Sequence, residues 1–364
     1  MLDLARVNQV LATLTDPNTG QDYATSKNAR NVRVEPGASG VRVSLDIELG
    51  YPAASQFEPI RKQIADALTA AGAAEVAVKV SSKIVPHTVQ RGLKVLPNVR
   101  NIVAVSSGKG GVGKSTVAVN LALALAAEGA RVGMLDADIY GPSQPTMLGI
   151  SGRPESEDGK TLEPLENFGI QASSIGFLID ADTPMVWRGP MVTSALTQLL
   201  NQTNWKDLDY LVVDMPPGTG DIQLTLAQQV PVTGALIVTT PQDIALLDAS
   251  KGLKMFEKVG VPILGIVENM AVHVCTNCGH AEHIFGSGGA QKMAQQYGIE
   301  VLGSLPLDIR IREQTDSGRP TVVADPDGDV AVRYKAIARR VAIKIAERAK
   351  DLSSKLPSIK VSNT

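Results

Sequence analysis

Cysteine is scarce in this sequence. Its 364 residues include only Cys275 and Cys278, which form a Cys-Thr-Asn-Cys motif. One close pair does not resemble the disulfide framework of a small secreted protein. The N-terminal segment also lacks the basic and then apolar pattern of a secretory signal and the Arg- and Ser-rich composition of a transit peptide. We therefore expect a cytoplasmic protein.

Aromatic residues, net charge and long apolar runs are also limited. Aromatics make up 4% of the chain, so extensive base-stacking surfaces are not indicated. The formal net charge of −2 gives no global basic field for nucleic acid or an anionic membrane. No apolar run reaches the roughly 18 residues of a membrane-spanning helix. We expect a globular protein with neither nucleic acid nor membrane as a partner.

A phosphate-binding loop is the most informative motif present. Residues 108–115 read Gly-Lys-Gly-Gly-Val-Gly-Lys-Ser, with a β-branched run before them and an Ala/Leu-rich run after them. A strand, a glycine loop and a helix N-terminus together form a phosphate cradle. Lys114 is expected to reach the β- and γ-phosphates, Ser115 to hold Mg²⁺, and Thr116 to add a phosphate contact. The expected nucleotide-binding residues of the loop are Gly108, Lys109, Gly110, Gly111, Val112, Gly113, Lys114, Ser115 and Thr116.

The chain divides into four segments. Residues 1–85 predict a helix, two strands, a helix and a strand, which is a small α+β domain. Residues 86–100 carry prolines and no sustained period, as a linker does. Residues 101–350 alternate apolar strand patterns with helical ones, which predicts a doubly wound α/β domain with a mostly parallel sheet. Residues 351–364 are polar, and we expect a disordered tail.

Carboxylates follow two of the predicted strands. Asp214 follows an apolar run and is the expected Walker-B-type partner of Mg²⁺. Asp138 is expected to position the attacking water, and Asp136 to stand in the outer shell of the metal. Pro216–Gly220 is expected to sense the γ-phosphate. The alternative is that these carboxylates cap the turns or helices that follow them.

Together these motifs resemble a known family. Gly108–Thr116 resembles the deviant Walker A motif of the SIMIBI class of ATPases. Asp136–Ser143, Asp214–Asp221 and the Cys-x-x-Cys motif match its Mrp/ApbC branch of iron–sulfur carriers, and the first 85 residues are similar to an iron–sulfur-assembly domain. This resemblance implies ATP as the nucleotide and a homodimer.

The resemblance also assigns roles to residues. It implies that Lys109 reaches the nucleotide of the partner subunit, and that Asn269, Pro306 and Asp308 lie beside adenine. Trp187–Met191 also resembles the family, but no role follows from that segment.

The residues around the cysteine pair leave three interpretations open. His273, His280 and His283 surround the pair. Cys275, Cys278, His280 and His283 can therefore form a zinc site, although at unusually short spacing. A redox dithiol normally begins a helix, and no helix is indicated there. The third interpretation is one [4Fe–4S] cluster held by two thiolates from each of two subunits.

The family resemblance favours the shared cluster. It implies an ATP hydrolase that carries the cluster from assembly scaffolds to apo iron–sulfur proteins, with nucleotide as the switch. A partitioning or division-site ATPase is the alternative, since it shares the loop. Such a protein needs a membrane or DNA surface, and the basic helical pattern of residues 330–352 is the one candidate for a membrane helix. That pattern is more typical of a helix docked on the core.

Overall fold

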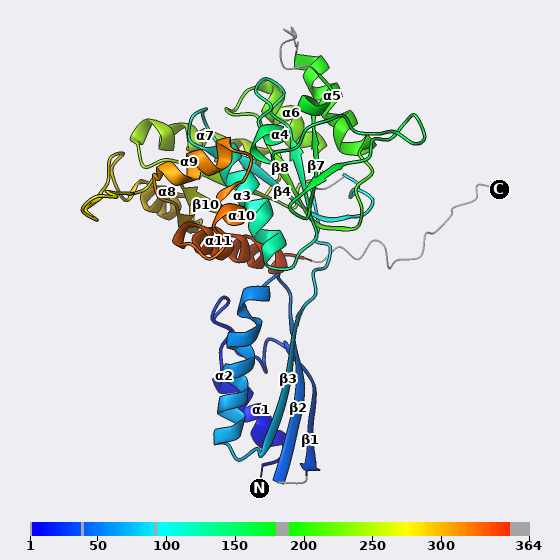
Figure 1. Cartoon of the computed structure of the whole chain (residues 1–364), viewed down its shortest axis with the longest axis vertical. Coiled ribbons are helices and arrows are strands. Elements are labelled where there is room, and N and C mark those ends of the chain that lie inside the picture. Colours follow the sequence, from blue (N-terminus) through cyan, green and yellow to red (C-terminus); the bar gives the residue numbers. More distant parts are fainter. Residues whose placement is uncertain (1, 38–39, 91–92, 180–188, 350–364) are drawn as a thin grey trace, which may run out of the picture.

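The computed structural model describes residues 2–37, 40–90, 93–179 and 189–349. A small N-terminal domain extends like a stalk from a larger domain (Figure 1). The predicted disordered tail, 351–364, lies outside the described residues, as do Trp187 and Arg188.

The N-terminal domain packs two helices on one face of a three-stranded sheet. Its elements are α1 (Leu4–Thr13), β1 (Ala29–Gly37), β2 (Gly40–Leu49), the short 3-10 helix η1 (Ala54–Gln56), α2 (Phe57–Ala70) and β3 (Glu75–Ser82), in strand order β1-β2-β3. Alternate residues of β2, from Val43 to Leu49, are buried. Ile60, Ile64 and Leu68 form the buried stripe of α2. The alternating apolar residues of β2 and the apolar stripe of α2 therefore pack in one core.

The larger domain is built on a mostly parallel sheet. The strands, in spatial order, are β13 (Val301–Ser304), β10 (Ile263–Glu268), β9 (Gly234–Thr239), β4 (Val99–Ser106), β8 (Leu208–Asp214), β5 (Val132–Asp136), β7 (Ile170–Ser174) and β6 (Leu165–Asn167). Only the pairing of β6 with β7 is antiparallel within this sheet. The predicted fold class, a doubly wound α/β domain after a small α+β domain, is confirmed.

Helices cover both faces of this sheet (Figure 1). They are α3 (Lys114–Ala127), α4 (Gln144–Met147), α5 (Gly189–Gln202), α6 (Asp221–Gln229), α7 (Asp243–Lys258), α8 (Gly289–Tyr297), α9 (Ile309–Asp316), α10 (Thr321–Ala324) and α11 (Asp329–Ala346), with the 3-10 helix η2 (Ile175–Phe177). Val103 and Val105 of β4 join one apolar cluster with α3 and α11. Ile102 and Ala104 join the other with α5 to α8. Near-continuous apolar strands are thus buried from both sides.

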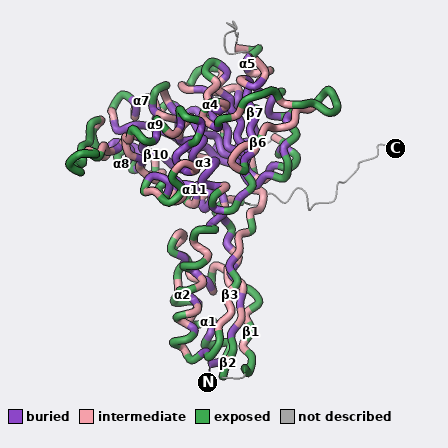
Figure 2. Tube along the Cα trace, in the orientation of Figure 1, coloured by how far each residue is buried: buried purple, intermediate pink, exposed green. Residues whose placement is uncertain are grey.

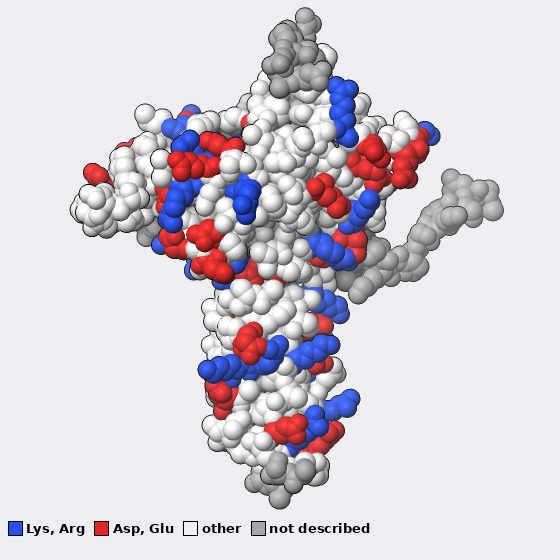
Figure 3. All heavy atoms as spheres, viewed as in Figure 1, with Lys and Arg blue, Asp and Glu red and all other residues white. Residues whose placement is uncertain are grey.

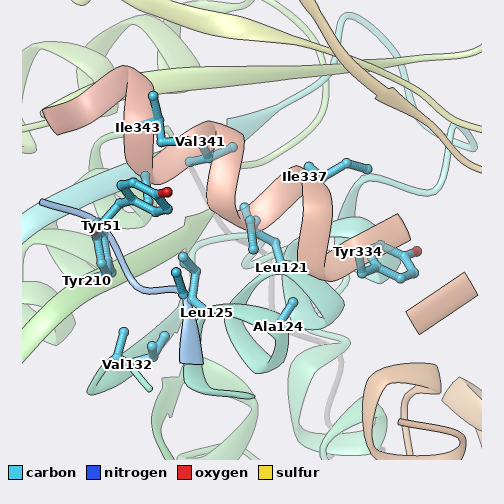
Figure 4. Close-up of a cluster of buried hydrophobic side chains, with 14 of the residues drawn as sticks. Tyr51, Leu121, Ala124, Leu125, Val132, Tyr210, Tyr334, Ile337, Val341 and Ile343 are labelled. Carbon is cyan, nitrogen blue, oxygen red and sulfur yellow. The ribbon is translucent and has the colours of Figure 1, made fainter. Parts of the chain in front are cut away.

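The C-terminal helix α11 docks on the core. Figure 4 shows its Tyr334, Ile337 and Val341 close to Leu121 and Ala124 of α3. Ile337, Val341 and Ile345, the apolar stripe of the sequence pattern, are all at most 2% exposed. This stripe is therefore buried in contacts within the protein. The membrane-helix interpretation of 330–352 is wrong for the described part of that segment.

Charges on the stalk are mixed in sign. Figure 3 shows lysines and arginines interspersed with acidic side chains along the visible face. Arg42 and Glu75 pair across neighbouring strands at 3.4 Å, and Arg30 and Glu48 pair at 3.3 Å. Within the described part of the chain, none of the helices has the length and apolar composition needed to cross a lipid bilayer.

A buried polar network joins the two domains at the narrow junction visible in Figure 2. Glu128, the C-cap of α3, is 1% exposed. Its carboxylate accepts hydrogen bonds from the backbone N–H and hydroxyl of Ser55, at 3.0 and 2.7 Å, and pairs with Arg339 of α11. Arg339 also donates to Asn18 at 3.0 Å. Because each charge has a partner, the junction is a specific interface rather than a flexible tether.

Candidate nucleotide site and cysteine hairpin

The phosphate loop lies between the end of β4 and the start of α3. Gly111 and Gly113 have φ values of 81° and 79°, a region that L-residues rarely adopt. A Cβ on Gly108 would lie 2.0 Å from the carbonyl carbon of Asp248, and one on Gly113 would lie 2.3 Å from Nδ2 of Asn269. These glycines are therefore required by the conformation and by close packing of the loop.

Lys114 lies at the centre of the site. Its side chain is 6% exposed and its ammonium pairs with Asp214, which is fully buried. The same ammonium lies 3.8 Å from Asp138 Oδ2 and 3.1 Å from the Ser115 hydroxyl. The structure thus brings together four of the residues that the sequence predicted for phosphate, metal and water binding. Thr116 follows them in the first turn of α3.

Asp136 and Asp214 are direct neighbours across parallel strands β5 and β8. Asp136 accepts hydrogen bonds from the Ser174 hydroxyl at 3.1 Å and from the backbone N–H groups of Gln144 and Asp138 at 3.0 and 3.1 Å. Burial, followed by the nearby charge of Asp214, raises the pKa of Asp136 to about 7. Two carboxylates this close in the protein interior favour a cation between or beside them.

The donor set fits a magnesium nucleotide. Carboxylates of Asp136 and Asp214 and the hydroxyl of Ser115 are oxygen ligands of the kind that Mg²⁺ uses, directly or through its waters. The glycine backbone and Lys114 supply positive groups for phosphate. Asp138 also has a raised pKa because it is buried, although Lys114 opposes the shift. These residues converge at the carboxyl ends of the strands, where open α/β sheets bind ligands.

The segment Pro216–Gly220, expected to sense the γ-phosphate, contacts the residue that precedes the phosphate loop. The backbone N–H of Gly218 donates to the carbonyl of Ser107 at 3.0 Å, and Gly218 has a φ of 97°. The Ser107 hydroxyl donates to the carbonyl of Lys109 at 2.9 Å. Lys109 itself is half-buried in the loop. A movement of the segment after Asp214 would therefore displace the residues around Lys109.

Asn269 lies against the loop rather than away from it. Its Nδ2 donates to the carbonyl of Val112 at 2.9 Å. The Pro306 segment runs alongside, since the Leu307 N–H donates to the Val272 carbonyl at 2.8 Å. Asp308 caps α9 and binds the guanidinium of Arg310. The hydrogen bond from Arg310 lowers the pKa of Asp308. The structure places Asn269 against the loop and Pro306 beside the segment that follows Asn269, while the Asp308 carboxylate has a local capping partner.

The cysteine pair occupies the turn of a small hairpin. Strands β11 (His273–Val274) and β12 (Ala281–Glu282) are antiparallel, and the Cys275 N–H donates to the His280 carbonyl at 2.9 Å. Cys275 is half-buried and Cys278 is exposed, and both are free thiols. Hydrogen bonds from the backbone of Cys278 and Asn277 lower the pKa of Cys275. The turn therefore favours a thiolate at an accessible position.

The zinc and redox interpretations gain no support from this hairpin. His273 and His283 use Nδ1 to contact the carbonyls of Leu307 and Ala271 at 3.0 and 2.7 Å. In the described ranges, which include the whole hairpin, no three histidine, cysteine, aspartate or glutamate side chains are arranged so that they could hold a metal ion by themselves. The motif also does not begin a helix. One chain therefore offers two sulfur ligands without a third ligand beside them.

Sequence reasoning missed Gln144 and Ser174. Both touch the acidic strand ends, as described above for Asp136, and the Gln144 amide also donates to Asp214 at 2.8 Å. Gln144 follows the Asp136–Ser143 motif directly, so its position was the only available signal. Ser174 closes β7, and only the strand order places it beside β5.

The chain matches two families of known proteins. The family described as NUBPL iron-transfer P-loop NTPase matches residues 98–342, and the family described as iron–sulfur cluster assembly protein matches residues 4–81. The first match covers well over half of the chain. This protein belongs to the NUBPL iron-transfer P-loop NTPase family. Membership supports nucleotide binding and, in general terms, nucleotide hydrolysis.

Named relatives agree with this family. The chain is 52% identical over 345 residues to the iron–sulfur cluster carrier protein of Escherichia coli strain K12, which covers 94% of this chain and 92% of the relative. It is 51% identical over 342 residues to the carrier of the same name from Haemophilus influenzae, covering 93% and 91%. The mouse iron–sulfur cluster transfer protein NUBPL is 54% identical over 256 residues, covering 69% of this chain and 80% of the mouse protein.

Solved structures share the fold of the larger domain. A nucleotide-binding protein from Archaeoglobus fulgidus, solved with ADP, aligns with a TM-score of 0.56 at 39% identity, covering 64% of this chain and 90% of that one. The cell-division ATPase MinD of Pyrococcus furiosus aligns with a TM-score of 0.51 at 22% identity, covering 66% and 98%. The MinD likeness extends to the fold alone.

Proposed function

We propose that this protein is an ATP-dependent iron–sulfur cluster carrier. The observation that carries the proposal is the coexistence, in one chain, of a buried nucleotide site and an accessible two-thiol hairpin. The family membership and the names of the relatives support the same role. The cargo is a [4Fe–4S] cluster, collected from assembly scaffolds and delivered to apo iron–sulfur proteins.

The ligand count requires a second subunit. A [4Fe–4S] cluster takes four thiolates, whereas this chain contains two cysteines. Two hairpins related by a two-fold axis supply the full set from Cys275 and Cys278 of each subunit. The exposure of Cys278 suits a cluster that must be handed on, because a recipient thiolate can approach it. The protein therefore acts as a homodimer.

The nucleotide site controls this dimer. In the proposal, Lys114 and the loop N–H groups bind phosphate, while Asp136, Asp214 and Ser115 hold Mg²⁺, which neutralises the phosphate charge when bound. Asp138 orients water for hydrolysis. Lys109 contacts the nucleotide of the partner subunit, so that bound ATP strengthens the interface. Slow hydrolysis releases this constraint and changes how the two hairpins face each other.

The base is adenine in this proposal. Because Asn269 Nδ2 is engaged with the Val112 carbonyl, the amide oxygen of Asn269 remains as the available acceptor. This acceptor can receive a hydrogen bond from the exocyclic amino group of adenine. It would repel the carbonyl oxygen that guanine has at the same position. In the same proposal, Pro306 and the backbone around Asp308 lie beside the adenine.

Anaerobic reconstitution tests the carrier role. Wild-type protein should gain about four iron and four sulfide per dimer and elute as a dimer. The variant Cys275→Ala/Cys278→Ala should lose the cluster, whereas Thr276→Ala, in the same turn, should retain it. Iron and sulfide bound in unchanged amounts by the double variant would refute the hairpin as the cluster site. Transfer to an apo-ferredoxin, followed by its absorbance, tests delivery.

A further inference from the structure

Gln144 occupies a special position beside the proposed metal site. It begins the short helix α4 after the segment that leaves β5, and it is 1% exposed. Its side chain reaches back toward the carboxyl ends of β5 and β8. A polar side chain with this burial needs specific partners.

Three hydrogen bonds connect Gln144 to the site. Its Nε2 donates to Asp214 Oδ2 at 2.8 Å and to the backbone carbonyl of Ser115 at 3.2 Å. Its backbone N–H donates to Asp136 Oδ2 at 3.0 Å. One residue therefore links both acidic strand ends to the first turn of α3.

The two oxygens of Asp214 have different partners. Lys114 pairs with Oδ1, and Gln144 holds Oδ2. Lys114 is the group expected to turn toward phosphate, and it would then leave Oδ1. Gln144 has no such second task, so Oδ2 remains bound and the carboxylate keeps its orientation.

The other side-chain atom of Gln144 is an acceptor that has no partner. Among the described residues, Oε1 of Gln144 is buried without a hydrogen bond. Its Nε2 has two acceptors already, so the amide is not reversed. A buried acceptor left open on a side chain that binds Asp214 indicates that a donor, such as water around a cation, belongs there.

We propose that Gln144 is a positioning residue for the magnesium site. It holds Oδ2 of Asp214 so that Oδ1 is the oxygen presented to the ion, and its Oε1 offers an acceptor to the ion's hydration shell. This inference rests on the proposed magnesium–nucleotide site. Partners that orient a metal-binding carboxylate typically change metal affinity by about 10- to 100-fold when removed.

Metal binding without turnover tests this role. Mn²⁺ serves as the probe, with free Mn²⁺ measured by electron paramagnetic resonance in the presence of ADP. Gln144→Leu should raise the Mn²⁺ dissociation constant about 10-fold. If Gln144→Leu fails to fold, Gln144→Met replaces it in the test, because a methionine side chain adapts its shape more readily. Gln144→Met should raise the Mn²⁺ dissociation constant by the same factor. Gln296→Leu, the same change at an exposed position of α8, is the matched control and should leave the constant unchanged.

Metal-free ADP binding separates positioning from a structural role. Fluorescent ADP in EDTA should bind wild type and Gln144→Leu with affinities within about twofold, because the loop contacts phosphate independently of the metal. Equal losses with and without metal would show a distorted loop and overturn the positioning role. A folded variant that binds Mn²⁺ as tightly as wild type would also overturn it. If wild type with ADP binds no Mn²⁺, the proposed nucleotide site fails and this inference fails with it.

Discussion

The nucleotide site and the cysteine hairpin differ in how much of each site one chain contains. The nucleotide site gathers buried groups from the ends of three strands, the loop and α4. The hairpin consists of two strands of two residues each, and its cysteines are half-buried and exposed. The first is held in place by the domain core, whereas the second has two sulfur ligands and little support. One site is therefore organised by folding and the other by assembly.

This difference has an energetic side. Asp136, Asp214 and Lys114 are all at most 6% exposed, so their charges lose hydration on folding and need one another or a ligand. The hairpin thiols remain close to solvent, so folding costs them little. Changes at the nucleotide site should therefore affect both stability and activity, and changes at the hairpin should affect cluster binding alone.

Loss of hydrolysis in Lys114→Ala is the strongest change that we expect. Removal of the buried ammonium should lower the phosphate-release rate by about 10²- to 10³-fold, because a preorganised charge at phosphate is lost. Cluster content after anaerobic reconstitution should stay at the wild-type value, since the hairpin is separate. Hydrolysis at the wild-type rate would refute the role of Lys114. A parallel loss of cluster would show that cluster binding depends on the nucleotide site.

A mixing experiment tests whether Lys109 acts across subunits. Lys109→Ala and Asp138→Asn should each be nearly inactive alone. In a heterodimer, the chain carrying Lys109→Ala keeps its own Asp138 and receives Lys109 from its partner. Random mixing makes half of the dimers heterodimers with one active site each, so about a quarter of wild-type activity should return. No recovery after verified subunit exchange would mean that Lys109 acts within its own chain.

The far end of α3 provides buried charges that already have partners. Glu128→Ala would leave Arg339, whose side chain is 12% exposed, without its acidic partner. The free energy of unfolding should fall by about 3 kcal/mol, as measured by urea denaturation. Asp316→Ala, which removes an exposed partner of Arg312 in α9, should cost under about 1 kcal/mol. Equal losses in the two variants would contradict a specific domain junction.

Removal of the two thiols should hardly change the stability of the apo-protein. Cys275→Ala/Cys278→Ala should change the free energy of unfolding by less than about 0.5 kcal/mol, because the hairpin turn contributes little to the core. Urea denaturation of the apo-protein checks this value. A loss of several kcal/mol would show that the hairpin supports the fold and would weaken the contrast between the two sites.

Local pattern explains what the sequence predicted well. The phosphate loop is contiguous, and β4, β8 and α3 have strong apolar patterns, so strand, loop and helix could be placed without tertiary information. Asp136 and Asp214 were predicted singly, as residues at strand ends. Their adjacency depends on the strand order β8-β5, which no local pattern contains.

Contacts between distant segments explain what the sequence did not predict. Glu128 and Arg339 are 211 positions apart, and neither lies in a recognisable motif. Gln144 and Asp214 are 70 positions apart, and a glutamine at a helix start is usually a surface residue. Asn269 was predicted from the resemblance alone, and its bond to Val112 joins residues that are 157 positions apart.

Helix α3 has a further consequence for the whole molecule. It begins at the phosphate loop and ends at Glu128, about 21 Å away at the normal helical rise. Its middle is buried from all sides, so it has no room to bend. Any displacement of the loop end along the helix axis must either break the bonds between Glu128 and Ser55 or carry the N-terminal domain with it. The orientation of the N-terminal domain relative to the larger domain therefore reports on the nucleotide site. A pair of fluorescent labels, one on each domain, can follow this orientation.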